Sequence, residues 1–133
     1  MADKIRFELV SPERLLMSTQ ADMVVVPGTA GEFGVMAGHV PLVSTIRPGI
    51  VEVHDGGSVA KLYVRGGFAE VAADVLTVLA EEAVALADLT AAEVEQTLRN
   101  LSEDIADAKD PEAKAKAQAE HDRWKLIREA LAA

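Results

Sequence analysis

Over the first two thirds of the chain, apolar residues recur at every second position in short stretches. Ile5, Phe7 and Leu9 are separated by charged residues, which is typical of a strand with one buried face. Short apolar runs bounded by turn-forming residues predict further strands at 23–26, 50–53, 59–64, 68–71 and 75–79. At this spacing, about ten strands fit before residue 87, so an antiparallel β-sandwich is predicted there.

The pattern changes near residue 87, after which no glycine occurs. Thr90 and Glu93 have the spacing of a capping box, so a helix is predicted to begin near residue 91. Apolar residues then recur at steps of three and four residues, which places them on one helical face. They are Val94, Leu98, Leu101, Ile105 and Ala108.

A second helix follows a short break. Lys109, Asp110 and Pro111 are predicted to form a turn, because aspartate caps helices well and proline suits the first helical position. A helix from about 111 to 131 then forms an antiparallel hairpin with the first. The predicted domains are a sandwich at 1–86 and a helical hairpin at 87–133.

Composition excludes several classes of function. The 133 residues carry a formal net charge of −9, which repels phosphate backbones and anionic lipids, so neither nucleic-acid binding nor direct lipid insertion is expected. The chain has no cysteine, which excludes disulfides, thiolate metal sites and cysteine catalysis. No apolar stretch reaches the roughly 20 residues of a membrane span. No secretory signal or transit peptide precedes the first predicted strand, and we expect a reducing compartment.

Two sets of residues invite a chemical interpretation. Gly28, Gly31 and Gly34 resemble a phosphate-binding loop, but the Gly-Lys-Ser/Thr ending and the following helix are missing, so turns between strands are predicted instead. His39, His54 and His121 with Glu32 match no metal-ligand spacing. We therefore predict no catalytic residue, no metal site and no cofactor.

The segment 27–49 places apolar residues among glycines and prolines. Phe33, Met36 and Leu42 are examples. Apolar residues at turns are either packed into a core or presented to a partner. The residues alone leave both alternatives open.

This segment also carries a family pattern. Residues 27–42 read Pro-Gly-Thr-Ala-Gly-Glu-Phe-Gly-Val-Met-Ala-Gly-His-Val-Pro-Leu, and they are followed by Arg47-Pro48-Gly49 and later by Gly66-Gly67-Phe68-Ala69-Glu70-Val71. The pattern and the order of the two domains resemble the epsilon subunit of the F-type ATP synthase.

The resemblance implies a ten-stranded sandwich that links the gamma subunit to the c ring at the foot of the rotating central stalk. The positions that match the family's c-ring contacts are Glu32, Phe33 and His39. Those that match its gamma contacts are Ser11, Ser44 and Arg65. The implied function is mechanical coupling of proton translocation to ATP synthesis, without catalysis by this chain. Its implied location is the cytoplasmic face of the bacterial inner membrane.

The resemblance also concerns the hairpin. In the family it lies folded or extends toward the alpha and beta subunits, where it hinders ATP hydrolysis, so a weak inhibition is expected here. Some members bind ATP through a motif resembling Ile-Asp-x-x-Arg-Ala. Here Asp88 is retained, but Ala91 replaces the arginine, and no nucleotide-binding site is predicted although Arg123 and Arg128 remain.

An alternative function keeps the same fold. A small β-sandwich could bind a ligand within its glycine-rich segment, or act as an adaptor whose hairpin contacts an unrelated helical partner. A nucleotide or metal motif would favour the ligand-binding alternative, and the sequence shows neither.

Overall fold

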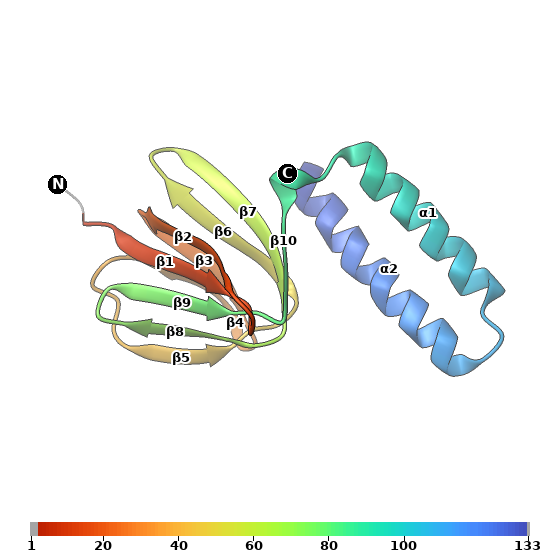
Figure 1. Cartoon of the computed structure of the whole chain (residues 1–133), viewed down its shortest axis with the longest axis horizontal. Coiled ribbons are helices and arrows are strands. Elements are labelled where there is room, and N and C mark those ends of the chain that lie inside the picture. Colours follow the sequence, from red (N-terminus) through yellow and green to blue (C-terminus); the bar gives the residue numbers. More distant parts are fainter. Residues whose placement is uncertain (1–2, 133) are drawn as a thin grey trace. The chain divides into compact units, whose positions relative to one another are not determined.

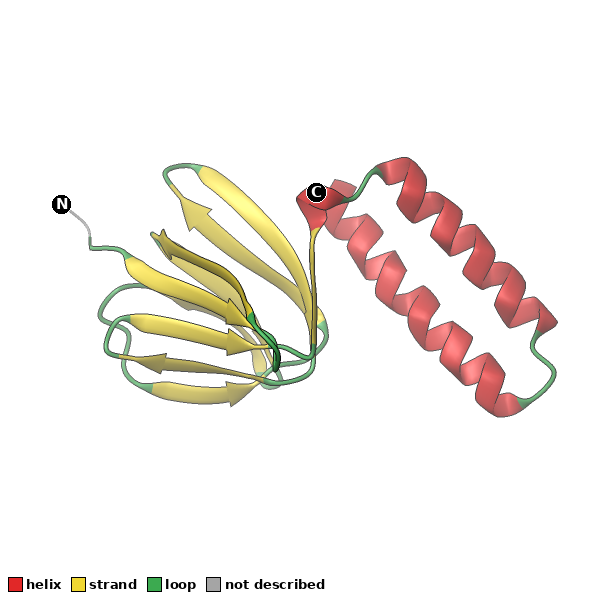
Figure 2. Cartoon of the chain, in the orientation of Figure 1, coloured by secondary structure: helices red, strands yellow, loops and turns green. Residues whose placement is uncertain are grey.

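The computed structural model describes residues 3–132. In this part of the chain, ten strands precede a short 3₁₀-helix and two α-helices (Figure 1). The strands are β1 (Ile5–Val10), β2 (Leu15–Ala21), β3 (Met23–Gly28), β4 (Gly31–Val35), β5 (Leu42–Thr45), β6 (Gly49–Asp55), β7 (Ser58–Arg65), β8 (Phe68–Ala72), β9 (Val75–Leu79) and β10 (Glu82–Ala85). The helices are η1 (Leu86–Asp88), α1 (Ala91–Asp107) and α2 (Pro111–Ala132). The predicted fold class, a β-sandwich followed by a two-helix hairpin, is confirmed (Figure 2).

The strands form two five-stranded sheets that face each other. Sheet A has the order β2-β1-β9-β8-β5, and sheet B has the order β10-β7-β6-β3-β4. Neighbouring strands are antiparallel with one exception, since β1 and β9 run parallel. The parallel pair arises because the chain passes through sheet B before β9 returns to lie beside β1.

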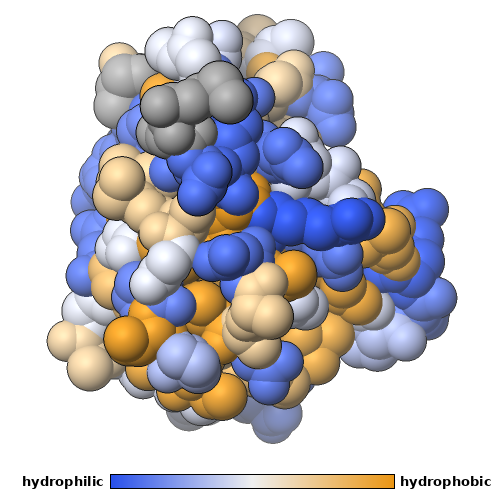
Figure 3. Space-filling view, turned by 90° about the vertical axis from the view of Figure 1, so that its left-hand side faces the viewer, coloured by the Kyte–Doolittle hydropathy of each residue, from blue (hydrophilic) through white to orange (hydrophobic). Residues whose placement is uncertain are grey.

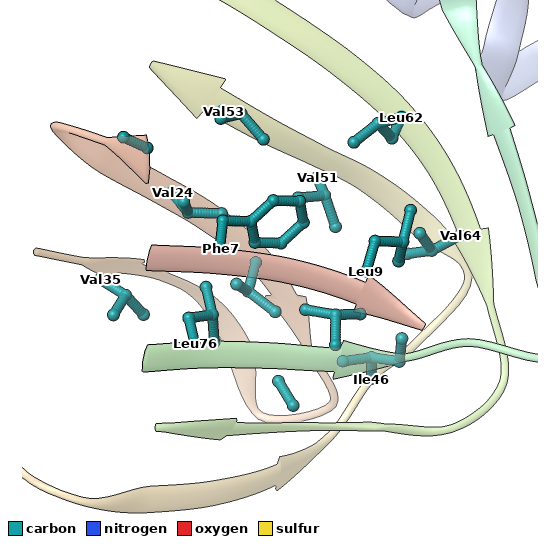
Figure 4. Close-up of a cluster of buried hydrophobic side chains, with 14 of the residues drawn as sticks. Phe7, Leu9, Val24, Val35, Ile46, Val51, Val53, Leu62, Val64 and Leu76 are labelled. Carbon is teal, nitrogen blue, oxygen red and sulfur yellow. The ribbon is translucent and has the colours of Figure 1, made fainter. Parts of the chain in front are cut away.

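Alternate residues of the strands build the core between the sheets. Phe7 of β1 points toward Val24 and Val51 of sheet B, and all three are fully buried (Figure 4). Leu9 and Leu76 of sheet A are buried in the same cluster. Each such side chain contributes roughly 1.5–3 kcal/mol relative to an exposed position. The core is therefore built from every second strand residue, as the sequence predicted for β1, and strands of both sheets contribute to it.

The chain divides into two compact units, the first up to Ala85 and the second from Leu86 onward. In the second unit, the amide of Glu93 donates to Thr90 Oγ1 at 3.2 Å, which confirms the predicted cap of α1. Ala108 has an extended backbone, so the predicted apolar stripe ends with Ile105 on the helix and Ala108 lies outside it. The first turn of α2 is capped in turn, because the amide of Ala113 donates to Asp110 Oδ1 at 2.7 Å.

The two helices contact each other along the hairpin. Their buried residues are Val94, Leu98 and Ile127. An ion pair also joins the helices, with Arg128 Nη1 lying 3.6 Å from Glu95 Oε1. Between them, α1 and α2 bury only these three side chains over 17 and 22 residues, so few large apolar contacts hold the hairpin.

Candidate functional site

A row of apolar side chains crosses the outer face of sheet A at one end. Val10, Leu79 and Phe68 are direct neighbours on β1, β9 and β8. The row continues onto β2, where Leu15 pairs with Val10 and Leu16 is the additional residue at a register shift. We call these five residues the apolar row. Phe68, Leu15 and Leu16 keep 41%, 55% and 37% of their surface exposed, so the row is open to a partner.

The neighbouring row on the same face is polar. Ser18 lies opposite Glu8, and Thr77 lies between Glu8 and Glu70. Glu8 and Glu70 carry carboxylates, which are rarely buried in proteins. On β5 this row ends with Val43, which pairs with Glu70 and is 64% exposed, so polar side chains bound the apolar row on β1, β2, β8 and β9 but not on β5.

The turn between β3 and β4 lies at the same end of the sandwich. Its Thr29 donates a backbone hydrogen bond to Thr45 at 3.1 Å, and the hydroxyl groups of the two threonines are 2.8 Å apart. The amide of Arg47 donates to Pro27 O at 2.9 Å. These bonds fix the turn against the connection between β5 and β6.

Glu32 and Phe33 follow this turn and have different surroundings. The Glu32 carboxylate is exposed and lies 3.9 Å from Arg47 Nη2. Phe33 is half-buried and packs against the core. Its ring covers Gly28, where an added Cβ would lie 2.9 Å from Phe33 Cε1. Phe33 thus fixes the turn, and Glu32 is the group that the turn presents to solvent.

Ser11 and Arg65 lie at this end as well, after β1 and at the end of β7. The Ser11 hydroxyl bonds the backbone of Arg14, donating to its carbonyl at 3.2 Å and accepting from its amide at 3.3 Å. Arg65 Nη2 pairs with Glu82 Oε2 at 3.0 Å. Ser44 is half-buried near the end of β5 and donates to the Thr45 carbonyl at 3.0 Å. The structure therefore brings Glu32, Ser11, Ser44 and Arg65 to one end of the sandwich.

His39 does not join them, because it follows β4 and lies at the opposite end. Its amide donates to Met36 O at 3.1 Å, and its Nδ1 is 2.7 Å from Val40 O. The loop is held by Gly38, whose amide donates to Asp74 Oδ1 at 2.8 Å. Figure 3 shows this end, with apolar side chains gathered in its lower part. Met36 and Val40 are 57% and 70% exposed there.

The apolar residues of segment 27–49 lie partly in the core and partly on the surface. Val35 and Ile46 are buried in the core, at 0% and 6% exposure. Met36 and Val43 are exposed at 57% and 64%. One segment therefore supplies core residues from β4 and from the β5–β6 connection, and exposed apolar residues from the β4–β5 loop and from the edge strand β5.

The positions considered for metal and nucleotide binding are separated. Among residues 3–132, no group of three or more His, Asp or Glu side chains could hold a metal ion. His54 Nε2 lies 3.1 Å from Glu52 Oε1 instead. Asp88 ends η1 and Ala91 begins α1, and both are exposed. In this same part of the chain, no helix is both long and apolar enough to cross a membrane.

Comparison with known proteins relates the chain to one family. The family model described as ATP synthase, Delta/Epsilon chain, beta-sandwich domain matches residues 4–86. The chain is 50% identical over 129 residues to the ATP synthase epsilon chain of Parvibaculum lavamentivorans, covering 96% of this chain and 98% of that one. It is 49% identical over 134 residues to that of Paramagnetospirillum magneticum, covering 100% and 98%.

A solved structure has the same fold. It is a chain of the Euglena gracilis mitochondrial ATP synthase, in a structure of OSCP, F1 and c-ring in rotational state 1. The TM-score is 0.80 at 24% identity, and the match covers 96% of this chain and 81% of that one.

Proposed function

Because the chain belongs to the ATP synthase delta/epsilon family, we propose that it works in the central stalk of an F-type ATP synthase, where its sandwich links the gamma subunit to the c ring. The family is one of noncatalytic subunits, so the chain transmits rotation and performs no bond chemistry. Proton translocation through the c ring and ATP synthesis are then coupled through the rigid sandwich.

The observation that supports docking is the apolar row. Exposed contiguous apolar surface on a small domain marks an interaction site, and here it lies beside the positions matched to gamma contacts. Ser11 follows Val10 of the row directly, while Ser44 and Arg65 lie at the same end of the sandwich. In this proposal, the gamma subunit covers the apolar row, and these three polar residues lie at the border of the contact.

The exposed Glu32 carboxylate is the proposed contact to the c ring. The turn that carries it is fixed by the Thr29–Thr45 bonds and by Phe33 on Gly28, so the carboxylate is held in place for a polar or basic loop. Electrostatic contacts of this exposed kind orient docking more than they hold it. His39 lies a strand length away, so its contact with a partner would be separate from that of Glu32.

The hairpin is the proposed regulatory element. Its few buried side chains make rearrangement inexpensive, which a folded and an extended form require. The extended form would contact the alpha and beta subunits and weakly inhibit hydrolysis. Since the two ATP synthase epsilon chains named above are bacterial, we propose that the protein lies at the cytoplasmic face of the inner membrane, bound peripherally.

Reconstitution tests this function. Purified chain is added to an ATP synthase core that lacks the epsilon subunit, and ATP-driven proton pumping and hydrolysis are measured. The wild type should restore pumping. Phe68→Asp should lose most of it, because the substitution places a charge in the apolar row. Val59→Asp is the matched control, since Val59 is similarly exposed at 45% but lies on β7, outside the row.

A variant that ends at Ala87 separates the two units. The core cluster lies wholly within the sandwich, so this variant should fold and restore pumping. Faster ATP hydrolysis with the shortened chain would support inhibition by the hairpin. Equal hydrolysis would exclude that part of the proposal and leave the coupling role intact.

A further inference from the structure

β2 is an edge strand whose free side can be identified from the bonds of its neighbour. The amide of Arg6 donates to Asp74 O at 3.0 Å, and Val10 O accepts from the amide of Ala80 at 2.9 Å. Since strand residues direct their N–H and C=O groups to alternate sides, Arg6, Glu8 and Val10 bond toward β9. The remaining residues of β1 therefore bond toward β2. They are Ile5, Phe7 and Leu9.

The register of the β1–β2 pair then shows which backbone groups of β2 have no strand to bond to. Ile5, Phe7 and Leu9 lie opposite Ala21, Thr19 and Met17, which are thus the bonded positions of β2. Ser18 and Gln20 direct their N–H and C=O groups away from β1, whereas Leu16 is the additional residue at the register shift. Both residues are exposed, and within residues 3–132 no strand lies on that side of β2. Their N–H groups and the Ser18 carbonyl form a free edge, while the Gln20 carbonyl accepts from Thr19 Oγ1 at 3.4 Å.

This edge has less protection than the other edge strands. Free edges are usually blunted by charge, proline, shortness or a β-bulge, because an open edge can pair with another strand. On β2 only the register shift at Leu16 serves this purpose. In the described chain, β4 carries Glu32 and glycines, β10 has four residues and includes Glu82, and β5 has four residues. β2 has seven residues, Leu-Leu-Met-Ser-Thr-Gln-Ala, without charge or proline.

A cavity lies along the same side of the sandwich. It has a volume of about 330 Å³ and is lined from sheet A by Met17, Thr19 and Gln20, and from sheet B by Val53, Asp55, Ser58 and Ala60. On sheet B, β10 pairs only with Leu62–Arg65 of β7. In the described chain, the start of β7 therefore has a strand on one side, β6, and none on the other. The two sheets are thus not closed by a strand on this side, and the space between them has a mixed lining of polar and apolar groups that includes the Asp55 carboxylate.

We propose that the partner that covers the apolar row adds an extended segment to the free edge of β2, continuing sheet A by one strand. This inference rests on the proposed function, in which that partner is the gamma subunit. Continuity argues for it, because Leu15 and Leu16 of β2 belong to the apolar row itself. The segment is uncharged along the edge, to match an uncharged β2, and its inward-facing side chains include polar as well as apolar groups, to match the mixed lining of the cavity.

Proline at residue 18 provides a test. The amide of Ser18 points away from β1, so Ser18→Pro removes a free donor without breaking a bond of the sandwich, and proline is tolerated at such an edge position. Ser18→Ala is the matched control, because it also removes the hydroxyl that accepts from Arg6 Nη2 at 3.3 Å but keeps the amide. Binding of both variants to an epsilon-depleted core containing gamma is measured. Ser18→Pro should bind at least tenfold more weakly than wild type, and Ser18→Ala should bind equally.

Amide exchange gives a second readout that needs no variant. In the isolated chain, the amides of Ser18 and Gln20 should exchange rapidly, and those of Met17 and Thr19 slowly. Binding to the core should slow the amides of Ser18 and Gln20 at least tenfold. Unchanged exchange, or wild-type affinity of Ser18→Pro, would overturn the inference alone. Concentration-dependent protection in the isolated chain would show self-pairing and overturn the choice of partner, whereas a wild-type chain that does not bind would overturn the proposed function as well.

Discussion

Gly67 lies against the backbone of Leu79 so closely that an added Cβ would be 1.8 Å from the Leu79 carbonyl oxygen. Gly67 also has φ +96, a conformation that side-chain-bearing residues rarely adopt. The neighbour is backbone and cannot rotate away, so the turn from β7 into β8 requires glycine at this position.

Gly67→Ala should therefore lower the free energy of unfolding by about 3 kcal/mol or more, as backbone strain and steric overlap add. Urea denaturation followed by circular dichroism measures the change. Gly38→Ala is the control, because Gly38 has a similar φ of +85 but no atom within 4 Å of an added Cβ. It should cost about 1 kcal/mol, the strain alone. Equal losses for the two variants would contradict the steric argument.

Ala73 also has a left-handed backbone conformation, but this position is occupied by a residue with a side chain. It has φ 50 in the turn between β8 and β9, where its Cβ is unfavourable. Ala73→Asn should raise the stability by about 0.5–1 kcal/mol, because asparagine tolerates this conformation better. Asparagine at the neighbouring strand position, Ala72→Asn, should give no such gain. Thermal unfolding of both variants decides, and a loss of stability in Ala73→Asn would contradict the prediction.

The sequence predicted strands such as β1, in which one face is buried and the other is more exposed. It missed strands such as β2, in which both faces are largely exposed. β1 alternates between buried and more exposed residues. In β2, by contrast, only Ala21 is buried, so the strand has no period of two to detect. β5 and β10 are short, and none of their residues is fully buried. Burial selects the pattern of a strand, and edge strands lack much of that selection.

The relative positions of the predicted contact residues could not be read from the sequence either. Glu32, Phe33 and His39 belong to one sequence pattern, yet β4 carries His39 to the far end of the sandwich from Glu32. The sequence also did not show that Phe33 packs on Gly28, since that contact depends on the β3–β4 turn. The apolar row was equally hidden, because Val10, Leu79 and Phe68 come together only through the pairing of three strands.

Lys4 gives a prediction for alkaline pH. Its ammonium group donates to Asp55, and this hydrogen bond, with the nearby charges of Asp55 and Asp22, raises the Lys4 pKa above 10.5 although desolvation opposes the shift. A raised pKa stabilises the fold below the unfolded-state value, and the stabilisation is lost as pH rises through the folded-state value. The stability difference between wild type and Lys4→Gln should persist to about pH 10 and vanish above the raised pKa. Urea titrations between pH 7 and 12 measure it, and a constant difference would contradict the assignment.

Helix caps determine the local stability of the hairpin. Thr90→Ala removes the acceptor of the Glu93 amide, and Asp110→Ala removes that of the Ala113 amide. Each loss should cost about 1 kcal/mol in the helix concerned. Amide exchange of the first turns of α1 and α2 reports each effect separately. Ser102→Ala, in the exposed interior of α1, should instead slow exchange slightly because alanine is the better helix former.

The ion pair between Glu95 and Arg128 makes the last prediction. Both side chains are nearly half exposed, at 46% and 43%, so their attraction is screened and should contribute about 0.2–1 kcal/mol. A double-mutant cycle of Glu95→Gln and Arg128→Gln, followed by amide exchange of α1 and α2, isolates this coupling. The coupling should fall further in 1 M salt, where the screening length is about 3 Å. A value well above this range would mean that the pair holds the hairpin closed, and the folded form would then be far harder to open than its sparse apolar packing implies.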